Sequence, residues 1–519
     1  MNAMSAMRAL RSDVLVLGGG PAGAAAAIEL SRLGDAVVLV ETRRAAQHIP
    51  CQSLPPSALT LLDRLGATEA VARDAGCHSA SLEVHWGGLE PASEEPSPSA
   101  ATPAPTLGTS LLIDRADFDR TLRERARAMG STVLDGVQVV SLQAVDGRRD
   151  AGANEAWIAT LSGPGEQIEV RARIAVIATG RPGSFGGRRR RRGPATLAVA
   201  GTWRNPAGAA WSVCEAGEHA WYWAGALPDG RTSVIAMVDP GSPLLGRHAD
   251  LEASYRKLIA GSRIVRARLH GPLDAGVHAT DASRQMTAPV ASPICLRVGD
   301  AAATLDPLSS QGLVAALTSA MQGAIAVHTM LRRPESTGAA IAFCEQRQRE
   351  VIERDRRHAG LYYARQAAET PTAFWRARAT PIPPEPSPGE ARNPRRRIGG
   401  DHWIRLDPAA RLEPTPALTA CFIEERPALV HPALDRPIAF IADTPVSELL
   451  QPLLATASPT PGVACARPAL RLAELMSHWR RLLPTGHAIA FLDSLLGRGV
   501  LLAGPDAARA EARPAAAAD

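Results

Sequence analysis

The sequence predicts an α/β protein made of a parallel-sheet domain, an antiparallel β domain and a small C-terminal α+β module. A glycine-rich turn between an apolar strand (13–17) and an alanine-rich helix (24–33), followed by a second strand (36–40), predicts the first domain. Alternating aromatic and aliphatic residues with turn signals between 195 and 285 predict the second. A proline-rich stretch precedes a third segment, and 519 residues suit about three domains.

The first turn has the spacing of a dinucleotide-binding fingerprint. Gly18 allows a tight turn, Gly20 lets backbone N–H groups approach a pyrophosphate at the helix N-terminus, and Gly23 lets helix and strand pack closely. Glu41 stands at the offset expected for an acid that accepts a hydrogen bond from a ribose hydroxyl. The predicted contacts to the dinucleotide come from Gly18, Gly20, Pro21, Ala22, Gly23 and Glu41.

A later segment, 298–312, reads Val-Gly-Asp-Ala-Ala-Ala-Thr-Leu-Asp-Pro-Leu-Ser-Ser-Gln-Gly. It resembles the second FAD fingerprint of glutathione-reductase-type flavoproteins. The resemblance implies that Asp300, after Gly299, holds the ribityl chain of FAD. It also implies that the small residues and Pro307 bring backbone against the isoalloxazine, with Gln311 and Gly312 completing this part of the site.

A middle segment, 112–122, resembles the DRxxFDxxL helix start of single-component flavin hydroxylases, in which the arginine, here Arg115, lies near the flavin pyrophosphate. Three motifs in the expected order favour FAD over NAD as the dinucleotide; the alternative is a turn that holds NAD or nothing. The predicted fold is therefore a glutathione-reductase-type FAD domain, an antiparallel β substrate domain and a small winged-helix-like C-terminal module.

The expected domain limits follow from composition and pattern. We expect FAD-binding residues in 1–194, with inserted β segments and a proline-rich loop at 91–106. The substrate-domain sheet, the second FAD segment with its helices, the linker, the winged-helix-like module and a disordered tail are expected at 195–285, 286–380, 381–400, 401–503 and 504–519. The module faintly resembles the peptide-recognition domains of peptide-modifying systems, which bind a leader segment as an added strand. A capping or dimerisation module is the alternative.

The charge of the chain does not indicate a nucleic-acid partner. Of 57 basic residues only Lys257 is lysine, so 56 are arginine, a bias typical of a GC-rich genome. The one dense cluster, Arg188 to Arg192, is either a solvated loop or a patch that steers an acidic partner. It lacks the interleaved aromatic residues of a nucleic-acid reader.

The cysteine spacing and the apolar pattern argue against a disulfide-rich, metal-binding or membrane protein. Seven widely spaced cysteines without a CxxC pair predict neither a disulfide framework nor a metal site. No run of about 18 apolar residues is present, so we expect no membrane partner and a cytoplasmic location.

Two further stretches resemble the flavin-dependent tryptophan halogenases. Residues 221–228, with Trp221 and Trp223, resemble their WxWxxP signature and imply a substrate-side position; residues 51–56 resemble their GESxPP segment. An aromatic pair at period two can also be one face of a strand that fills a core. The halogenating lysine and glutamate are missing, because His78 and Ser309 stand at their expected positions.

What remains resembles the flavoprotein monooxygenases that mature tryptophylquinone amine oxidases and dehydrogenases. The resemblance implies hydroxylation of a tryptophan in a peptide or protein precursor, with electrons from NAD(P)H or a separate flavin reductase. His78 is the first candidate for the catalytic base, although a histidine hydrogen-bonded on a sheet surface is an equal alternative. Asp306 is a candidate for orienting the flavin ring region.

Two other classes stay open. One is a small-molecule aromatic hydroxylase or an alkene-reducing flavoprotein of the geranylgeranyl-reductase type. The other is a non-catalytic flavoprotein that serves as a binding partner for a precursor.

Overall fold

The structure, a computed structural model, describes residues 8–42, 51–87, 109–145, 155–164, 166–181, 185, 187–246, 250–381, 398–454 and 469–504. The chain divides into two compact units, Met1–Ile382 and Pro383–Asp519. The proline-rich loop expected at 91–106, residues 382–397 of the expected linker, and the tail beyond Gly504 lie outside the described residues.

The first sheet of the first unit carries the glycine-rich turn. Its strand order is β17-β18-β9-β1-β2-β6, parallel except for the edge pair β17–β18, and β8 and β7 extend it antiparallel from β9. The strands are β1 (Arg8–Leu17), β2 (Val37–Glu41), β6 (Thr132–Asp135), β7 (Gln138–Ala144), β8 (Trp157–Gly163), β9 (Glu166–Ile177), β17 (Ala291–Ser292) and β18 (Cys295–Arg297). The run Val14 to Leu17 is buried throughout, as expected for a parallel strand covered on both faces.

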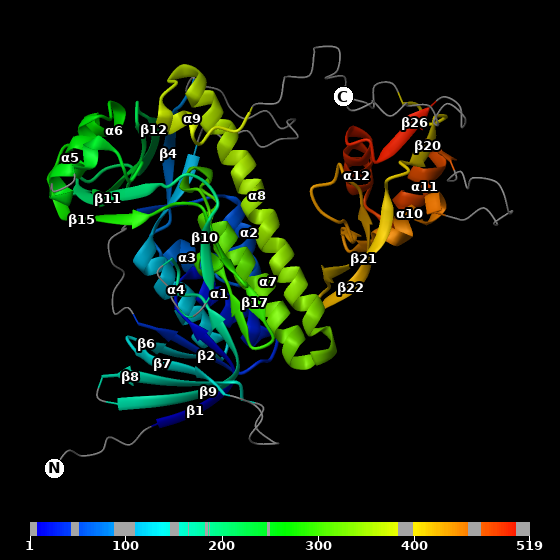
Figure 1. The fold of residues 1–519 in the computed structure, drawn as a ribbon, viewed down its shortest axis with the longest axis horizontal. Helices are drawn as coiled ribbons and strands as arrows, with labels where there is room; N and C mark the ends of the chain where they lie inside the picture. Colours follow the sequence, from blue (N-terminus) through cyan, green and yellow to red (C-terminus); the bar gives the residue numbers. More distant parts are fainter. Residues whose placement is uncertain are drawn as a thin grey trace. The chain divides into compact units, whose positions relative to one another are not determined.

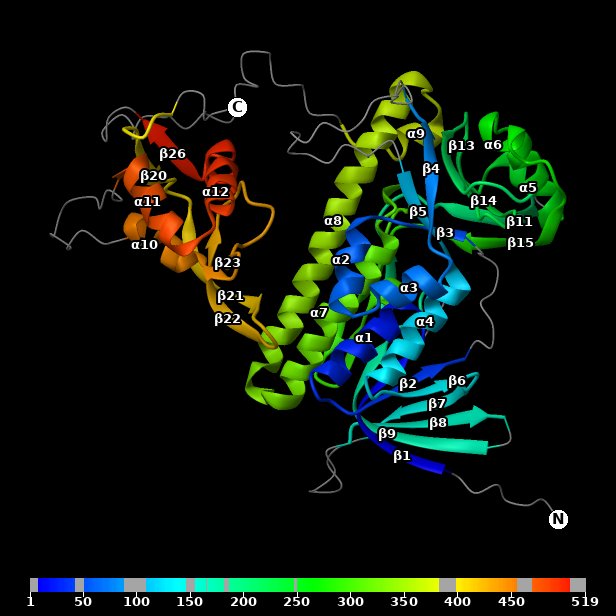
Figure 2. The ribbon, with the colours of Figure 1, turned by 180° about the vertical axis from the view of Figure 1, so that it is seen from behind.

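Helices of the first unit pack on this sheet and on one another. They are α1 (Pro21–Arg32), α2 (Ser57–Arg64), α3 (Thr68–Asp74), α4 (Arg115–Ala128), α7 (Gly312–Arg332) and the long α8 (Thr337–Glu369). Helix α1 contacts α4 and α7. Asp114 caps α4, because its carboxylate accepts hydrogen bonds from the backbone N–H groups of Ala116 and Asp117. Figures 1 and 2 show α8 running from the level of the first sheet to that of the second.

The second sheet has the order β15-β11-β14-β13-β12-β4-β5-β3 and is antiparallel except for the pair β12–β4. Its strands are β3 (Cys51–Leu54), β4 (His78–His85), β5 (Thr109–Asp114), β11 (Leu197–Arg204), β12 (Trp211–Ala216), β13 (Ala220–Ala226), β14 (Arg231–Val238) and β15 (Leu273–Asp281). Residues 195–285 therefore supply only five of the eight strands, and β3 to β5 come from the segment that we assigned to FAD binding. Helices α5 (Leu251–Ala260) and α6 (Ile264–Ala267) pack on one face, where Tyr222 lies.

A third, small sheet links β10 (Arg188–Arg191), β16 (Gln285–Ala288) and β19 (Ala303–Thr304). Short elements complete the first unit: η1 (Pro243–Leu245), η2 (Gly299–Ala301), η3 (Pro307–Ser309), η4 (Pro334–Ser336) and α9 (Ala373–Arg376). By length and composition α7 is the one described helix that could cross a membrane, yet 67% of its most apolar window is buried inside the fold. Such burial is typical of a core helix.

The second unit has its own apolar core. Its strands are β20 (Trp403–Leu406), β21 (Arg411–Leu418), β22 (Ile423–Val430), β23 (Phe440–Ile441), β24 (Thr444–Pro445), β25 (Leu470–Arg471) and β26 (Leu501–Gly504), and its helices are α10 (Val446–Leu454), α11 (Leu472–Leu482) and α12 (Thr485–Gly497). Trp479 on α11 is fully buried and its indole N–H donates to the Leu449 carbonyl at 2.8 Å. This bond and the surrounding leucines join α10 to α11.

One of the closest backbone approaches of the first unit lies at the glycine-rich turn. A methyl group added at Gly23 would lie 1.7 Å from the Gly18 carbonyl oxygen. We expect Gly23→Ala to lower the free energy of unfolding by more than about 3 kcal/mol, because backbone must move. Thermal unfolding checks this, with Gly338→Ala as the control, since no atom lies within 4 Å of the added methyl there. Equal melting temperatures for the two variants would contradict the close-packing argument.

Candidate functional site

The three predicted FAD segments meet at the start of α1. A methyl group added at Gly20 would lie 4.0 Å from Arg115 Nη2, and one at Gly299 would lie 2.7 Å from the Ala22 Cβ. Burial opposes the charge of Arg115, but the carboxylates of Asp119 and Asp300 outweigh it and raise the pKa of the guanidinium. Segments up to almost three hundred residues apart in the chain thus border one site.

The groups at this site fit the pyrophosphate and ribose of FAD. Gly20 is the N-cap of α1 and Pro21 follows it, with no side-chain cap, which leaves the helix N-terminus to a phosphate. Arg115 is held in place by Asp119 Oδ1 at 2.7 Å and Gln52 Oε1 at 2.8 Å. Glu41 is 5% exposed, and its Oε2 accepts the Gly19 N–H at 2.7 Å.

The second FAD segment is fixed at both ends. At one end Arg181 Nε pairs with Asp300 Oδ2 at 2.9 Å. At the other, Asp306 Oδ1 accepts the Leu308 N–H at 3.1 Å and caps η3, which begins at Pro307. Ser310 then adopts a left-handed conformation, and Gln311 and Gly312 form the start of α7.

Asp306 belongs to a buried network that the sequence did not indicate. Its Oδ1 accepts a hydrogen bond from the Tyr363 hydroxyl at 3.0 Å, and Arg284 Nη2 lies 3.6 Å from its Oδ2. Arg284 Nε also pairs with Asp355 Oδ2 at 2.6 Å, and the same oxygen accepts the Asp306 N–H at 3.0 Å. Burial raises the pKa of Asp306, Arg284 opposes this, and Asp355 adds to it. Asp306 therefore anchors the segment after it to α8.

Trp221 and Trp223 project from the face of β13 opposite to Tyr222. Trp221 is 2% exposed, and its ring centroid lies 6.1 Å from that of Trp86. Trp375 and Tyr363 complete an aromatic cluster around Trp86, at 5.2 and 6.2 Å. Trp223 is half-buried and contacts this cluster as well as a second one around Cys51.

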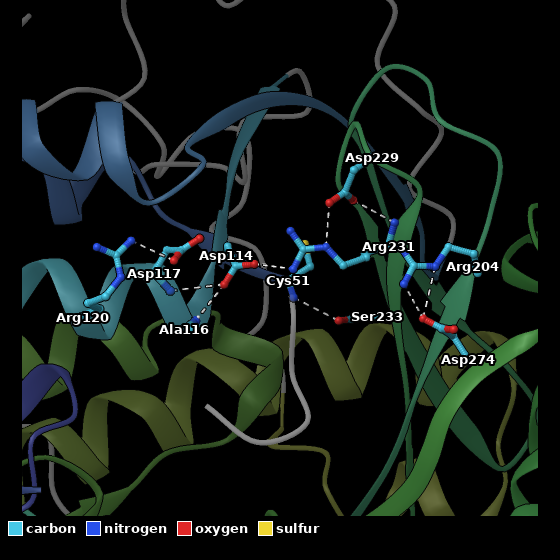
Figure 3. Close-up of polar contacts among 10 residues, drawn as sticks. All are labelled: Cys51, Asp114, Ala116, Asp117, Arg120, Arg204, Asp229, Arg231, Ser233 and Asp274. Carbon is cyan, nitrogen blue, oxygen red and sulfur yellow. Dashed lines mark hydrogen bonds and ion pairs between the residues drawn. The ribbon is translucent and has the colours of Figure 1, made fainter. Parts of the chain in front are cut away.

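His78 lies in a pocket of about 290 Å³ at the start of β4, lined by Gly76, His78, Asp114, Asp117, Leu227, Pro228, Asp229 and Arg231. Figure 3 shows Arg231 between Asp114 and Asp229, both of which it contacts. No described residue hydrogen-bonds to the His78 ring. Beside the pocket, burial and the Asp114 charge raise the pKa of the Cys51 thiol to about 12, so this thiol stays neutral.

The structure does not bring His78 to Asp306. His78 and Trp86 share a face of the second sheet but lie at opposite ends of β4, eight residues apart, which is roughly 25 Å along a strand. Trp86 belongs to the cluster that contains Tyr363, the hydrogen-bond donor to Asp306. The two catalytic candidates, His78 and Asp306, therefore lie near opposite ends of one sheet face.

The fold and the site define a flavoprotein. Residues 11–338 match the FAD binding domain family, and the chain belongs to this family. The tryptophan 2-halogenase of Chondromyces crocatus is 26% identical over 346 residues, which is 64% of this chain and 64% of the length of that enzyme.

Solved structures extend the likeness. Peptidyl tryptophan dihydroxylase QhpG, essential for tryptophylquinone cofactor biogenesis, is 26% identical with a TM-score of 0.69, over 94% of this chain and 99% of that one. The flavin-dependent halogenase CmlS shares the fold at 20% identity and a TM-score of 0.72, over 96% of each chain. These findings confirm the predicted FAD cofactor and the relationship to halogenase-related FAD monooxygenases, and they make the chain an FAD-dependent oxidoreductase.

Two carboxylates test the FAD contacts. We expect Asp300→Ala to weaken FAD retention by tenfold or more, on the order of the loss of one charged hydrogen bond. Glu41→Gln should cost less, because an amide oxygen can still accept from Gly19 N–H and from ribose. Equilibrium dialysis of FAD measures both. Equal affinities in the two variants would place the ribityl contact elsewhere.

The raised pKa of Asp306 predicts a pH signature of stability. The folded protein keeps a proton that the unfolded chain releases near about pH 4, so this group contributes stability that is lost as the pH rises through its folded pKa. Asp306→Asn is neutral throughout, so its stability relative to wild type should increase from pH 4 upward, by up to about 1.4 kcal/mol per pH unit.

Asp229→Asn is the control of opposite sign. Burial raises the pKa of Asp229, but hydrogen bonds from Arg231 outweigh this and lower it. The relative stability of this variant should therefore increase as the pH falls below about 4. Urea unfolding between pH 3 and 7 measures both differences, and parallel curves for wild type and Asp306→Asn would refute the assignment.

Proposed function

We propose that this protein is an FAD-dependent monooxygenase that hydroxylates a tryptophan side chain in a peptide or protein precursor during biogenesis of a quinone cofactor. The observation that carries the proposal is the 26% identity to the peptidyl tryptophan dihydroxylase over 94% of the chain, second unit included. We also propose a cytoplasmic location, with electrons from NAD(P)H or from a separate flavin reductase.

The residues present argue against halogenation. The single lysine, Lys257, is exposed on α5, and α5 packs on the face of the second sheet that carries Tyr222. Trp221 and His78 lie on the other face, so Lys257 cannot serve a substrate there. Ser309, at the position of the halogenase glutamate, donates its hydroxyl to the Asp306 carbonyl at 2.9 Å.

Each group has a role in the proposed reaction. Bound FAD, once reduced, would supply the two electrons that activate dioxygen, one atom of which enters the aromatic ring while the other leaves as water. Asp306 is a positioning residue that holds the segment from Pro307 to Gln311 against α8. The buried cluster around Trp86 excludes water from one end of the sheet face.

In the second unit we propose that the precursor adds as a strand along β26. The hairpin β21–β22 is a poor template, because Pro414 lies opposite Pro427 in its register. Neither proline can donate to the other strand, so each turns its ring nitrogen to an outer edge and removes a donor there. Among the described strands β26 pairs only with β20 and offers a second edge.

The test is a mass measurement on a candidate precursor. With reduced FAD and oxygen, the whole chain should add about 16 or 32 Da, expected for one or two hydroxylations, and should give no halogenated product when chloride or bromide is present. A chain that ends near residue 390 keeps the first compact unit and should retain FAD but lose the mass gain.

The outcomes separate the alternatives. A truncated chain that hydroxylates the precursor as fast as the whole chain would show that the second unit is not a docking module. Efficient turnover of free tryptophan or a small phenol, with the precursor untouched, would establish the small-molecule hydroxylase instead. A reduced protein that fails to consume oxygen would favour a non-catalytic flavoprotein.

A further inference from the structure

Strand β10 and the residue after it carry a stripe of positive charge that forms no ion pair with the described residues. We define the arginine stripe as Arg188, Arg190, Arg191 and Arg192, all four of which are exposed. In the antiparallel register with β16, the partners of β10 are neutral residues: Ala288, Thr287, Met286 and Gln285. Within the described residues none of the four guanidinium groups forms an ion pair.

Other exposed arginines of the first unit do have acidic partners. Many arginines of the first unit have an acid within ion-pair distance, including the exposed Arg120, Arg256 and Arg356. Asp281 is close enough for Arg191 to lower its pKa, although burial opposes that shift. Its carboxylate is nevertheless occupied by Ser283 and Gln285. Asp281 offsets at most one of these four charges, so the stripe keeps a net positive charge.

The stripe is fastened to the second FAD segment. Arg189, the half-buried member of the run, donates through Nη2 to the Asp300 carbonyl at 3.2 Å and to Thr304 Oγ1 at 2.7 Å. Thr304 lies in β19, which pairs with β16 in the same small sheet as β10. Strand β10 therefore lies beside Asp300, the residue proposed to hold the ribityl chain. Arg191 shares the face of Arg189, and Arg188 and Arg190 lie on the other face of the strand.

We propose that the arginine stripe is an electrostatic guide for free FAD, which it attracts through the pyrophosphate as the dinucleotide enters. The inference rests on the proposed contact between Asp300 and FAD. Guanidinium groups recognise phosphate oxygens in a bidentate manner, and a cluster of one sign raises the association rate of an oppositely charged ligand. A guide of this kind matters most when a separate reductase supplies reduced FAD and the dinucleotide must be taken up in each turnover.

The experiment measures FAD uptake by flavin-free protein, from the quenching of flavin fluorescence in a stopped-flow instrument. The stripe variant is R188Q/R190Q/R191Q/R192Q. The matched control, R263Q/R266Q/R365Q/R376Q, removes four exposed arginines from α8, α9 and the α6 segment and has the same net charge. At low ionic strength we expect the stripe variant to lose roughly tenfold in association rate constant, and the control less than about twofold.

Measurements at high salt and with a second ligand test the proposal further. The loss should disappear near about 0.5 M salt, where exposed charges are screened, while the dissociation rate constant stays within about twofold of wild type. Riboflavin, which lacks the pyrophosphate, should bind all three proteins at equal rates. An equal effect of the stripe and control variants on FAD uptake, or an equal loss with riboflavin, would overturn the proposal.

A different binding partner of the arginine stripe would give a different result. If FAD uptake is unchanged but reduction of the bound flavin by NADPH slows in the stripe variant, the stripe serves the nicotinamide donor and the proposal is wrong. If only electron delivery from a reductase protein slows, the stripe is a protein-docking surface and the proposal is again wrong. Failure of precursor hydroxylation with normal FAD kinetics would instead concern the proposed function alone.

Discussion

The structure depends on the contact between the glycine-rich turn and the strands on either side of it. Gly18 has a positive φ, and a methyl group there would lie 2.4 Å from the Ala178 carbonyl oxygen at the end of β9. A methyl group at Gly23 would lie closer still, 1.7 Å from the Gly18 carbonyl oxygen. Because backbone packs on backbone here, the start of α1 comes near enough to β9 for Arg115 and Gly299 to border it. The contacts proposed for the FAD pyrophosphate depend on that approach.

The sheet face proposed for the substrate is formed by strands from separate parts of the chain. Strands β3 to β5 join β11 to β15 in one sheet, and α8 covers the end where Trp86 and Trp221 lie. The network of Asp306, Arg284, Asp355 and Tyr363 ties the second FAD segment to α8 at the same end. The flavin segment and the aromatic cluster are thus held by one helix, so a shift of α8 would move both.

The sequence predicted the features that depend on residues close together in the chain. Glycine spacing and the Gly299-Asp300 pair indicated FAD, which the family match confirms. The sharing of a sheet by β3 to β5 was missed, because pairing between strands more than a hundred residues apart leaves no periodic signal. Arg284, Asp355 and Tyr363 were missed for a related reason, since a buried ion-pair network has no fixed spacing. Likewise, the separation of His78 from Asp306 became evident only from the position of each residue relative to β4.

The paired prolines of the hairpin β21–β22 also affect the chain while it is being synthesised. A two-stranded ribbon with free donors on both edges can recruit the same ribbon from another molecule. Pro414 and Pro427 interrupt both edges at one level of the ladder, and charged Arg426 and Glu425 stand beside Pro427. The hairpin is therefore protected from edge-to-edge aggregation during synthesis, when the helices that follow it in the chain have not yet been made.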